Sequence, residues 1–352
     1  MNSKKKAIVV LGMHKSGTSM LANLLQLAGV YLGEEENLKG PAYENLFGFF
    51  ENKEILDINE RLLEILGGSW YKLPLFETGW AESDHLNDLY KEAKEILNKL
   101  SENHALIGFK EPRTTVLMPF WENVLKENFD IRNILIYRQP REVARSLMQR
   151  NKFTENEAID IWFKYNQIVL DYLELKSFEI IRYEDLLEDA VSYSKYLFDK
   201  LKIDYSENVL QEIYFTVSNS LRHSSYSDED FFKDSNYKQE YKQLHKKLIT
   251  LDKKLNLSFR KTEFIEDKDL HIKTLEDKLD KIKRQMKQDW SNFENEMKNH
   301  GKTMEERDYY NWKLKELEKA SKNKGNQVII ASIPIIGQLF IVYKFIKKQL
   351  SK

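Results

Sequence analysis

One lysine near the start of the chain lies in a setting suited to binding an anion. Lys15 lies between Gly12 and Gly17 in a short loop. The apolar run Ala7–Leu11, which predicts a buried strand, precedes this loop, and a helix with apolar residues at helical spacing follows it. Glycines let a backbone turn sharply and aim several N–H groups at one point, and a helix start adds a positive dipole there. The stretch therefore predicts a cradle for a phosphate or sulfate group.

The loop differs from the phosphate-binding loop of nucleoside triphosphatases. Gly12 and Gly17 have the spacing of that pattern, but Thr18 stands where the pattern has its lysine. Such enzymes also hold magnesium with a carboxylate after a second strand. The candidate strands here run instead into Lys110 and Arg138, and cations at these positions favour chemistry without a metal.

Several motifs together resemble the sulfotransferase family, in its bacterial and Golgi-like branch. The loop, GMHKSGTS at 12–19, is similar to the family's 5′-phosphosulfate loop. The stretch LIYRQPREVARS at 135–146 resembles the 3′-phosphate site, with a strand, an arginine and a serine eight residues later. IRYEDL at 181–186, GFFEN at 48–52 and FKEPR at 109–113 also resemble segments of this branch and occur in the family's order.

The resemblance implies an α/β fold with a P-loop-like parallel sheet flanked by helices. The alternation of short apolar stretches and amphipathic helices up to Phe232 favours the same class. We expect five strands, at Ala7–Leu11, Val30–Leu32, Ala105–Phe109, Ile134–Tyr137 and Phe178–Ile181.

The resemblance also implies a reaction and its donor. Family members move a sulfuryl group from 3′-phosphoadenosine 5′-phosphosulfate (PAPS) to a hydroxyl or amine, a step that needs alignment and charge stabilisation. Lys15 would neutralise the charge that grows on the leaving phosphate. Other loop residues would bind the 5′-phosphate end: His14, Ser16, Gly17, Thr18 and Ser19. Arg138 and Ser146 would bind the 3′-phosphate. Tyr183 would touch the nucleotide, and Arg222 would close over it.

Several of these assignments have a plainer alternative. Lys15 would be a solvated loop lysine. Thr18 and Ser19 would simply cap their helix, and Arg138 would form an ion pair with Glu142. Tyr183 would fill the core.

The acceptor must lose a proton, which requires a general base. Cytosolic members use a histidine after the third strand, whereas this chain has the sequence KEPR there. Golgi-type members take a glutamate from the segment after the first helix. We therefore choose Glu51, with Glu44 and Glu111 as alternatives. Lys110 and Arg113 would bind the sulfate or an acidic acceptor, and Lys110 joins Lys15 and Glu51 in the predicted catalytic set.

Composition excludes several classes of protein. The 352-residue chain has a formal net charge of −1, which argues against a nucleic-acid-binding protein. It has no cysteine, so disulfides, thiolate metal sites and cysteine nucleophiles are excluded. Its seven histidines lack paired metal-ligand spacing, and we expect no metal.

The chain changes character after residue 232. The stretch from Lys238 to Lys319 is rich in Lys, Glu, Asp and Gln and has no proline. Apolar residues spaced by three and four predict heptad seams: Leu244, Leu248, Leu251, Leu255, Ile272, Leu275, Leu279, Ile282 and Met286. We expect an α/β domain over 1–232, an α-helical coiled-coil region over 233–325, and a basic amphipathic C-terminal helix over 326–352.

The last segment predicts contact with a membrane surface. The apolar stretch Val328–Tyr343 is too short to span a bilayer, and lysines flank it. We expect it to lie on an anionic membrane; a terminal helix docked on the catalytic domain is the alternative. Because His14 and Lys15 interrupt the first apolar stretch, we do not expect a secretion signal. The predicted location is the cytoplasmic face of a membrane.

These observations give one leading function and two others. The first is a sulfotransferase that modifies a glycan or a lipid-linked acceptor, with a homo-oligomer formed through the coiled coil. Aromatic residues such as Trp70, Tyr71, Trp80 and Trp162 would line the acceptor pocket, although rings of this kind more often belong to a core. The alternatives are a nucleotide-dependent kinase and a non-catalytic nucleotide-binding module with a coiled-coil tether.

Overall fold

The computed structural model describes residues 4–40, 48–174, 176–217 and 226–255. All of them belong to one compact unit that ends at Arg260. The predicted heptads from Ile272 to Met286 and the apolar segment Val328–Tyr343 lie outside the described residues. Within the described ranges, no helix is both long enough and apolar enough to cross a membrane.

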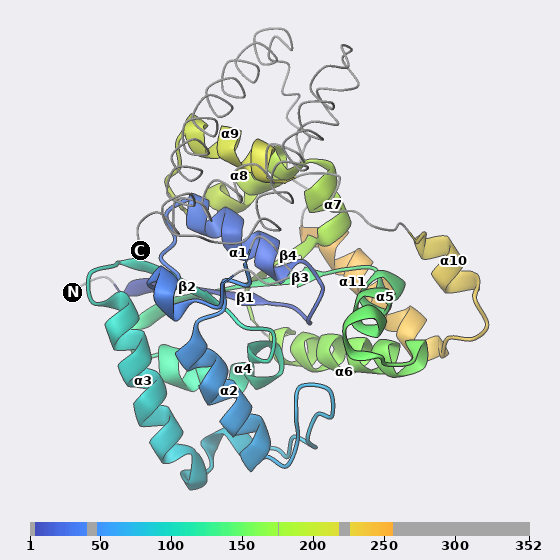
Figure 1. Ribbon diagram of the computed structural model, residues 1–352, viewed down its shortest axis with the longest axis horizontal. Helices are drawn as coiled ribbons and strands as arrows, with labels where there is room; N and C mark the ends of the chain where they lie inside the picture. The colour runs from blue at the N-terminus through green and yellow to red at the C-terminus, as the bar shows by residue number, and fades with distance from the viewer. Residues whose placement is uncertain (1–3, 41–47, 175, 218–225, 256–352) are drawn as a thin grey trace, which may run out of the picture. The chain divides into compact units, whose positions relative to one another are not determined.

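Four parallel strands form the sheet, in the order β2-β1-β3-β4 (Figure 1). They are β1 (Lys5–Leu11), β2 (Leu106–Lys110), β3 (Phe129–Tyr137) and β4 (Phe178–Arg182). Parallel pairing places the carboxyl ends of the strands along one edge. The residues that follow each strand are therefore brought together there, as the α/β prediction requires.

The predicted fifth strand is not formed. At Val30–Leu32, only Tyr31 makes a single parallel bridge, to Ile107 of β2. The segment is bounded by Gly29 and Gly33, both at positive φ, so the chain turns away before a second pair can form.

Helices cover both faces of this sheet. They are α1 (Thr18–Leu27), α2 (Lys53–Ile65), α3 (Asn87–Ser101), α4 (Thr114–Leu125), α5 (Pro140–Asn151), α6 (Glu155–Leu173), α7 (Tyr183–Glu188), α8 (Ala190–Leu201), α9 (Glu207–Thr216), α10 (Asp228–Lys233) and α11 (Gln239–Leu255). Alternate side chains of β1 belong to two hydrophobic cores. Helices α1, α8 and α9 pack over one core and α3, α4 and α6 over the other (Figure 1).

Helix caps fix the chain directly after two predicted site residues. Asn52, which follows Glu51, accepts hydrogen bonds from the N–H groups of Glu54 and Ile55 at the start of α2. Gln139, which follows Arg138, accepts from two N–H groups at the start of α5, where Pro140 is the first helical residue. Both caps fix the backbone directly after the predicted site residue, Glu51 in one case and Arg138 in the other.

Helix α11 is part of the α/β unit. Its residues Tyr241, Leu244 and Leu248 are buried in the same core as Phe231 and the strand residue Val9. The unit therefore extends past the predicted boundary at residue 232. A helix packed on a domain and a helix in a coiled coil have similar apolar spacing, so the spacing of Leu244 and Leu248 could not separate the two.

Candidate active site

The loop between β1 and α1 has the geometry of an anion cradle. Lys15 and Gly17 both have left-handed φ, 68° and 94°, and Ser16 N donates to Met13 O at 3.2 Å. Gly17 is the N-cap of α1 and offers no side chain to the first N–H groups of that helix. The helix start thus keeps the donors that an anion would use.

The loop is braced from the neighbouring elements. Gly12 N donates to Thr115 Oγ1 of α4 at 2.8 Å, and the same hydroxyl donates to Gly12 O at 3.1 Å. A Cβ added at Gly17 would lie 2.1 Å from the ring of Tyr183, so the loop packs directly on the residue after β4.

Arg138, the residue directly after β3, is the predicted 3′-phosphate ligand and contacts the predicted 5′-phosphate loop. Its Nη1 donates to Lys15 O at 3.3 Å, and its guanidinium carbon lies 4.7 Å from the centroid of the Tyr183 ring. Its Nη2 also pairs with Glu142 at 2.9 Å, so the ion pair expected as the plainer alternative is formed, and binding of the 3′-phosphate stays a prediction. Lys15, Arg138 and Tyr183 lie together at one edge of the sheet.

The hydroxyl groups of Ser146 and Ser19 both donate to backbone carbonyls, and Thr18 is buried. Ser146 Oγ donates to Glu142 O in its own helix at 3.0 Å, and Ser19 Oγ donates to Phe49 O at 3.4 Å. Arg222 and Glu44 lie outside the described residues.

Glu51 and Lys110 form a buried ion pair. The Nζ of Lys110, whose residue is only 1% exposed, lies 2.7 Å from Glu51 Oε1. The second oxygen of Glu51 lies 3.7 Å from Lys39 Nζ. Burial lowers the pKa of the Lys110 ammonium, and the Glu51 carboxylate opposes that effect. Two residues predicted as catalytic are thus brought into direct contact from segments far apart in the chain.

Both carboxylate oxygens of Glu111 accept hydrogen bonds from neighbouring residues. Its carboxylate accepts hydrogen bonds from Asn59 Nδ2 at 2.7 Å, from Arg113 N at 3.0 Å, and from Arg113 Nη1. Burial raises the pKa of this carboxyl against the opposing charge of Arg113. Arg113 in turn pairs with Glu60 at 2.8 Å.

His14 packs against an aromatic cluster formed by Trp70, Tyr71 and Phe153. Its ring centroid is 4.7 Å from that of Trp70, and its Nε2 is buried without a hydrogen-bond partner among the described residues. Burial, reinforced by nearby cations, lowers the imidazole pKa well below its usual value of 6.5; the cations are Arg113, Arg150, Lys110 and Lys15. His14 is therefore neutral near pH 7.

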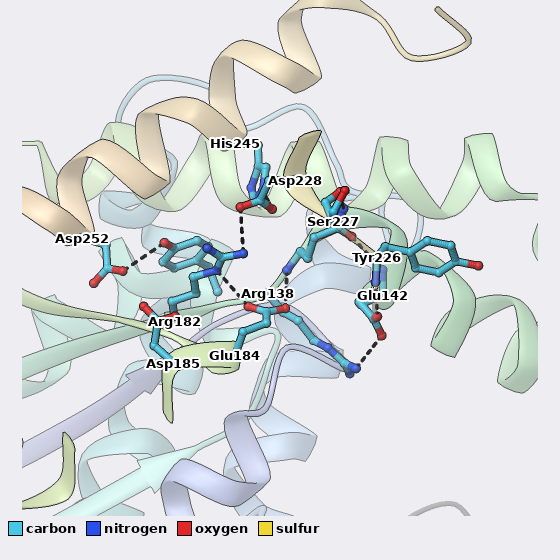
Figure 2. Close-up of polar contacts among 12 residues, drawn as sticks. Arg138, Glu142, Arg182, Glu184, Asp185, Tyr226, Ser227, Asp228, His245 and Asp252 are labelled. Atoms are coloured by element: carbon cyan, nitrogen blue, oxygen red, sulfur yellow. Dashed lines mark hydrogen bonds and ion pairs between the residues drawn. The ribbon is translucent and has the colours of Figure 1, made fainter. Parts of the chain in front are cut away.

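A cavity of about 220 Å³ lies beside Arg138 and Tyr183. Its other lining residues include Glu142, Arg182, Glu184, Tyr226, Ser227 and Asp228. Figure 2 shows how Arg182 pairs with Glu184 and with Asp228, which in turn contacts His245 of α11.

Asp228 and His245 were not predicted from the sequence. Asp228 lies in a polar stretch that has the composition of a linker, and no spacing relates it to His245 or Arg182. Burial would raise the pKa of the Asp228 carboxyl, but the hydrogen bond from His245 and the charges of His245 and Arg182 lower it.

Besides His14 Nε2, two polar groups around the loop remain without partners in the described part of the chain. Ser16 Oγ and Arg138 Nε are buried and make no hydrogen bond there. Buried polar groups of this kind fit a ligand with oxygen atoms at both places. No group of three His, Cys, Asp or Glu side chains in the described ranges is placed to hold a metal ion.

A family model for the sulfotransferase domain matches residues 5–268. The chain belongs to the sulfotransferase family. The match spans the loop, Lys110, Arg138, the cavity and α11, so all of these belong to the sulfotransferase domain. No curated protein matches the chain.

Solved structures of the family are similar at low identity. The sulfotransferase domain from the curacin biosynthetic pathway aligns with 70% of this chain and 99% of its own, at 18% identity and a TM-score of 0.40. A sulfotransferase from Mycobacterium tuberculosis aligns with 70% of this chain and 77% of its own, at 16% identity and a TM-score of 0.37. The family assignment depends on the family model, which covers residues 5–268.

Proposed function

We propose that this sulfotransferase transfers a sulfuryl group from PAPS to a hydroxyl or amine of a glycan or a lipid-linked acceptor. The observation that carries the proposal is the hydrogen bond from Arg138 to the carbonyl of Lys15. It brings Arg138 into contact with the loop that carries Lys15, beside a cavity of about 220 Å³. A nucleotide with a phosphate at each end of its ribose needs two such sites close together.

The loop and Arg138 would hold the two charged ends of PAPS, which when bound supplies the activated sulfuryl group. The N–H groups at the start of α1 and the hydroxyl of Ser16 would donate to the 5′ end. Arg138 would donate to the 3′-phosphate from its Nε, which is buried without a partner in the described part of the chain. Lys15 would place positive charge beside the leaving oxygen, an interaction that strengthens as that oxygen becomes charged.

Glu51 is our proposed general base. Its carboxylate lies 2.7 Å from the Lys110 ammonium, and a carboxylate can accept the proton of the attacking hydroxyl. Glu111 is a weaker choice, because its oxygens already accept three hydrogen bonds.

The acceptor would contact the aromatic cluster that packs against His14. Trp70, Tyr71 and Phe153 are in ring contact, and half of Tyr71 is exposed. Such rings can stack on the apolar face of a sugar. Trp162 was expected among these rings, but it is fully buried in the core and cannot line a pocket.

The sequence beyond residue 255 suggests a membrane location and an oligomeric state for the enzyme. We propose that the basic apolar tail binds the cytoplasmic face of an anionic membrane and that the charged helical region supports a homo-oligomer. Both proposals depend on the sequence pattern alone.

The test is metal-free transfer of radiolabelled sulfate from PAPS to a glycan and lipid extract. We expect label in an acceptor in the presence of EDTA, and a loss of about 100-fold or more in Lys15→Ala. Lys152→Ala is the matched control, because Lys152 is also a lysine with left-handed φ, at 58°. Turnover of ATP that requires magnesium would favour the kinase alternative, and binding without turnover of either nucleotide would favour the non-catalytic module.

A further inference from the structure

One wall of the cavity is held by side chains from other elements. Tyr226 N donates to Glu142 Oε1 at 2.9 Å, and Gln139 Nε2 donates to Ser227 O at 3.4 Å. We call residues 226–228 the cavity wall. Its first two residues are thus tied to α5 and to the residue that caps α5.

The third residue of the cavity wall, Asp228, is held from two sides. Its Oδ2 lies 2.8 Å from Arg182 Nη2, and its Oδ1 lies 2.8 Å from His245 Nε2 (Figure 2). His245 is fully buried on α11. Its imidazole packs among the rings of Trp162, Phe231 and Phe232. This packing fixes the direction of the Nε2 contact.

Further hydrogen bonds connect Arg182 to the residue next to Arg138, the predicted 3′-phosphate ligand. Arg182 Nε donates to Glu184 Oε2 at 3.2 Å, and Glu184 Oε1 accepts from Gln139 N at 3.0 Å. Gln139 directly follows Arg138. A continuous polar path therefore connects α11 to the residue next to the predicted 3′-phosphate ligand (Figure 2).

We propose that His245 is a positioning residue that holds the cavity wall, through Asp228, in the geometry that binds the nucleotide. None of the residues that line this cavity comes from α11, so His245 acts through Asp228. Nucleotide affinity then depends on how α11 packs against the rest of the domain. This inference rests on the proposed function, because it takes a PAPS-type nucleotide as the ligand of the cavity.

The experiment is titration of the full chain with 3′-phosphoadenosine 5′-phosphate (PAP), without metal. Gln at position 245 can place a donor near the position of Nε2, whereas Asn cannot reach it. We expect His245→Asn to weaken PAP binding about tenfold and His245→Gln to stay within about threefold of the wild type. Asp252→Asn is the control, because Asp252 lies on the same helix, contacts Tyr137 at 3.1 Å and is not among the residues that line the cavity.

A second readout does not need the ligand. Hydrogen exchange at the Tyr226 amide, which donates to Glu142, reports the position of the cavity wall directly. We expect faster exchange in His245→Asn than in His245→Gln or Asp252→Asn.

The outcomes separate this inference from the proposed function. If the wild type does not bind PAP, the proposed function fails. If the wild type binds PAP and His245→Asn binds it equally well, or if all three variants lose affinity equally, the inference about His245 fails.

Discussion

At Gly17, the absence of a side chain lets the loop pack against the ring of Tyr183. In Gly17→Ala, the new Cβ would lie 2.1 Å from that ring, at a φ of 94°. Gly29 has a similar φ of 88° with nothing within 4 Å, so Gly29→Ala isolates the backbone strain, about 1–2 kcal/mol. We expect Gly17→Ala to lower the free energy of unfolding further and to weaken PAP binding, as measured by urea denaturation and titration. Equal losses in the two variants would contradict the packing described here.

The buried imidazole of His14 makes stability depend on pH. Because burial lowers its pKa in the folded state, the unfolded chain binds more protons as the pH falls below about 6.5. The free energy of unfolding therefore decreases with falling pH through this range. We expect His14→Phe to lose less stability between pH 7.5 and pH 5.5 than the wild type, by urea denaturation at each pH. An identical slope in both proteins would show that His14 is not buried as a neutral ring.

The positions of residues at the strand ends could be predicted where the signal is local in the chain. Lys15 and Arg138 each lie inside a contiguous motif, and the structure brings them into contact, whereas their roles stay predictions. Asp228 and His245 meet because α11 packs on β4 and Asp228, at the start of α10, pairs with Arg182 at the end of that strand, and no local pattern carries that information.

At the scale of elements, the pair of Glu51 and Lys110 ties the start of α2 to the end of β2. In Glu51→Gln the buried ammonium of Lys110 would lose its partner, and removal of one member of a buried pair costs about 3–5 kcal/mol. The exposed Glu54→Gln is the control. We expect the double variant Glu51→Gln/Lys110→Met to recover stability but not sulfate transfer, by thermal unfolding and the transfer assay. Full stability of Glu51→Gln would mean that the pair is not buried as described.

Element boundaries followed from the sequence where apolar runs were long. The runs at Ala7–Leu11 and Phe178–Ile181 gave strands β1 and β4 to within a few residues. Val30–Leu32 is also apolar but forms only a single bridge, because the flanking glycines determine the path of the chain there.

At the scale of the whole molecule, the compact unit requires α11. A chain that ends after Phe232 would leave the core without Tyr241, Leu244 and Leu248, which are buried against it. We expect such a chain to be unfolded by circular dichroism, whereas a chain that ends after Arg260 unfolds cooperatively. Cooperative folding of the shorter chain would place the domain boundary at the predicted residue 232.

The extent of the unit could not be predicted because the composition changes before the packing does. Residues 239–255 are as rich in charge as the sequence that follows them, and only the burial of one helix face shows that they belong to the α/β domain. The two cationic sites, in contrast, lie at the edge of the sheet where a parallel α/β fold brings strand ends together.

The most direct measurement is calorimetric titration of the full chain with PAP and with ATP in EDTA. If Lys15 and Arg138 bind the two ends of one adenosine bisphosphate, PAP binds at least about tenfold more tightly than ATP, and Lys15→Ala and Arg138→Ala each weaken PAP binding. Equal affinity for both nucleotides, or binding that requires magnesium, would contradict this account.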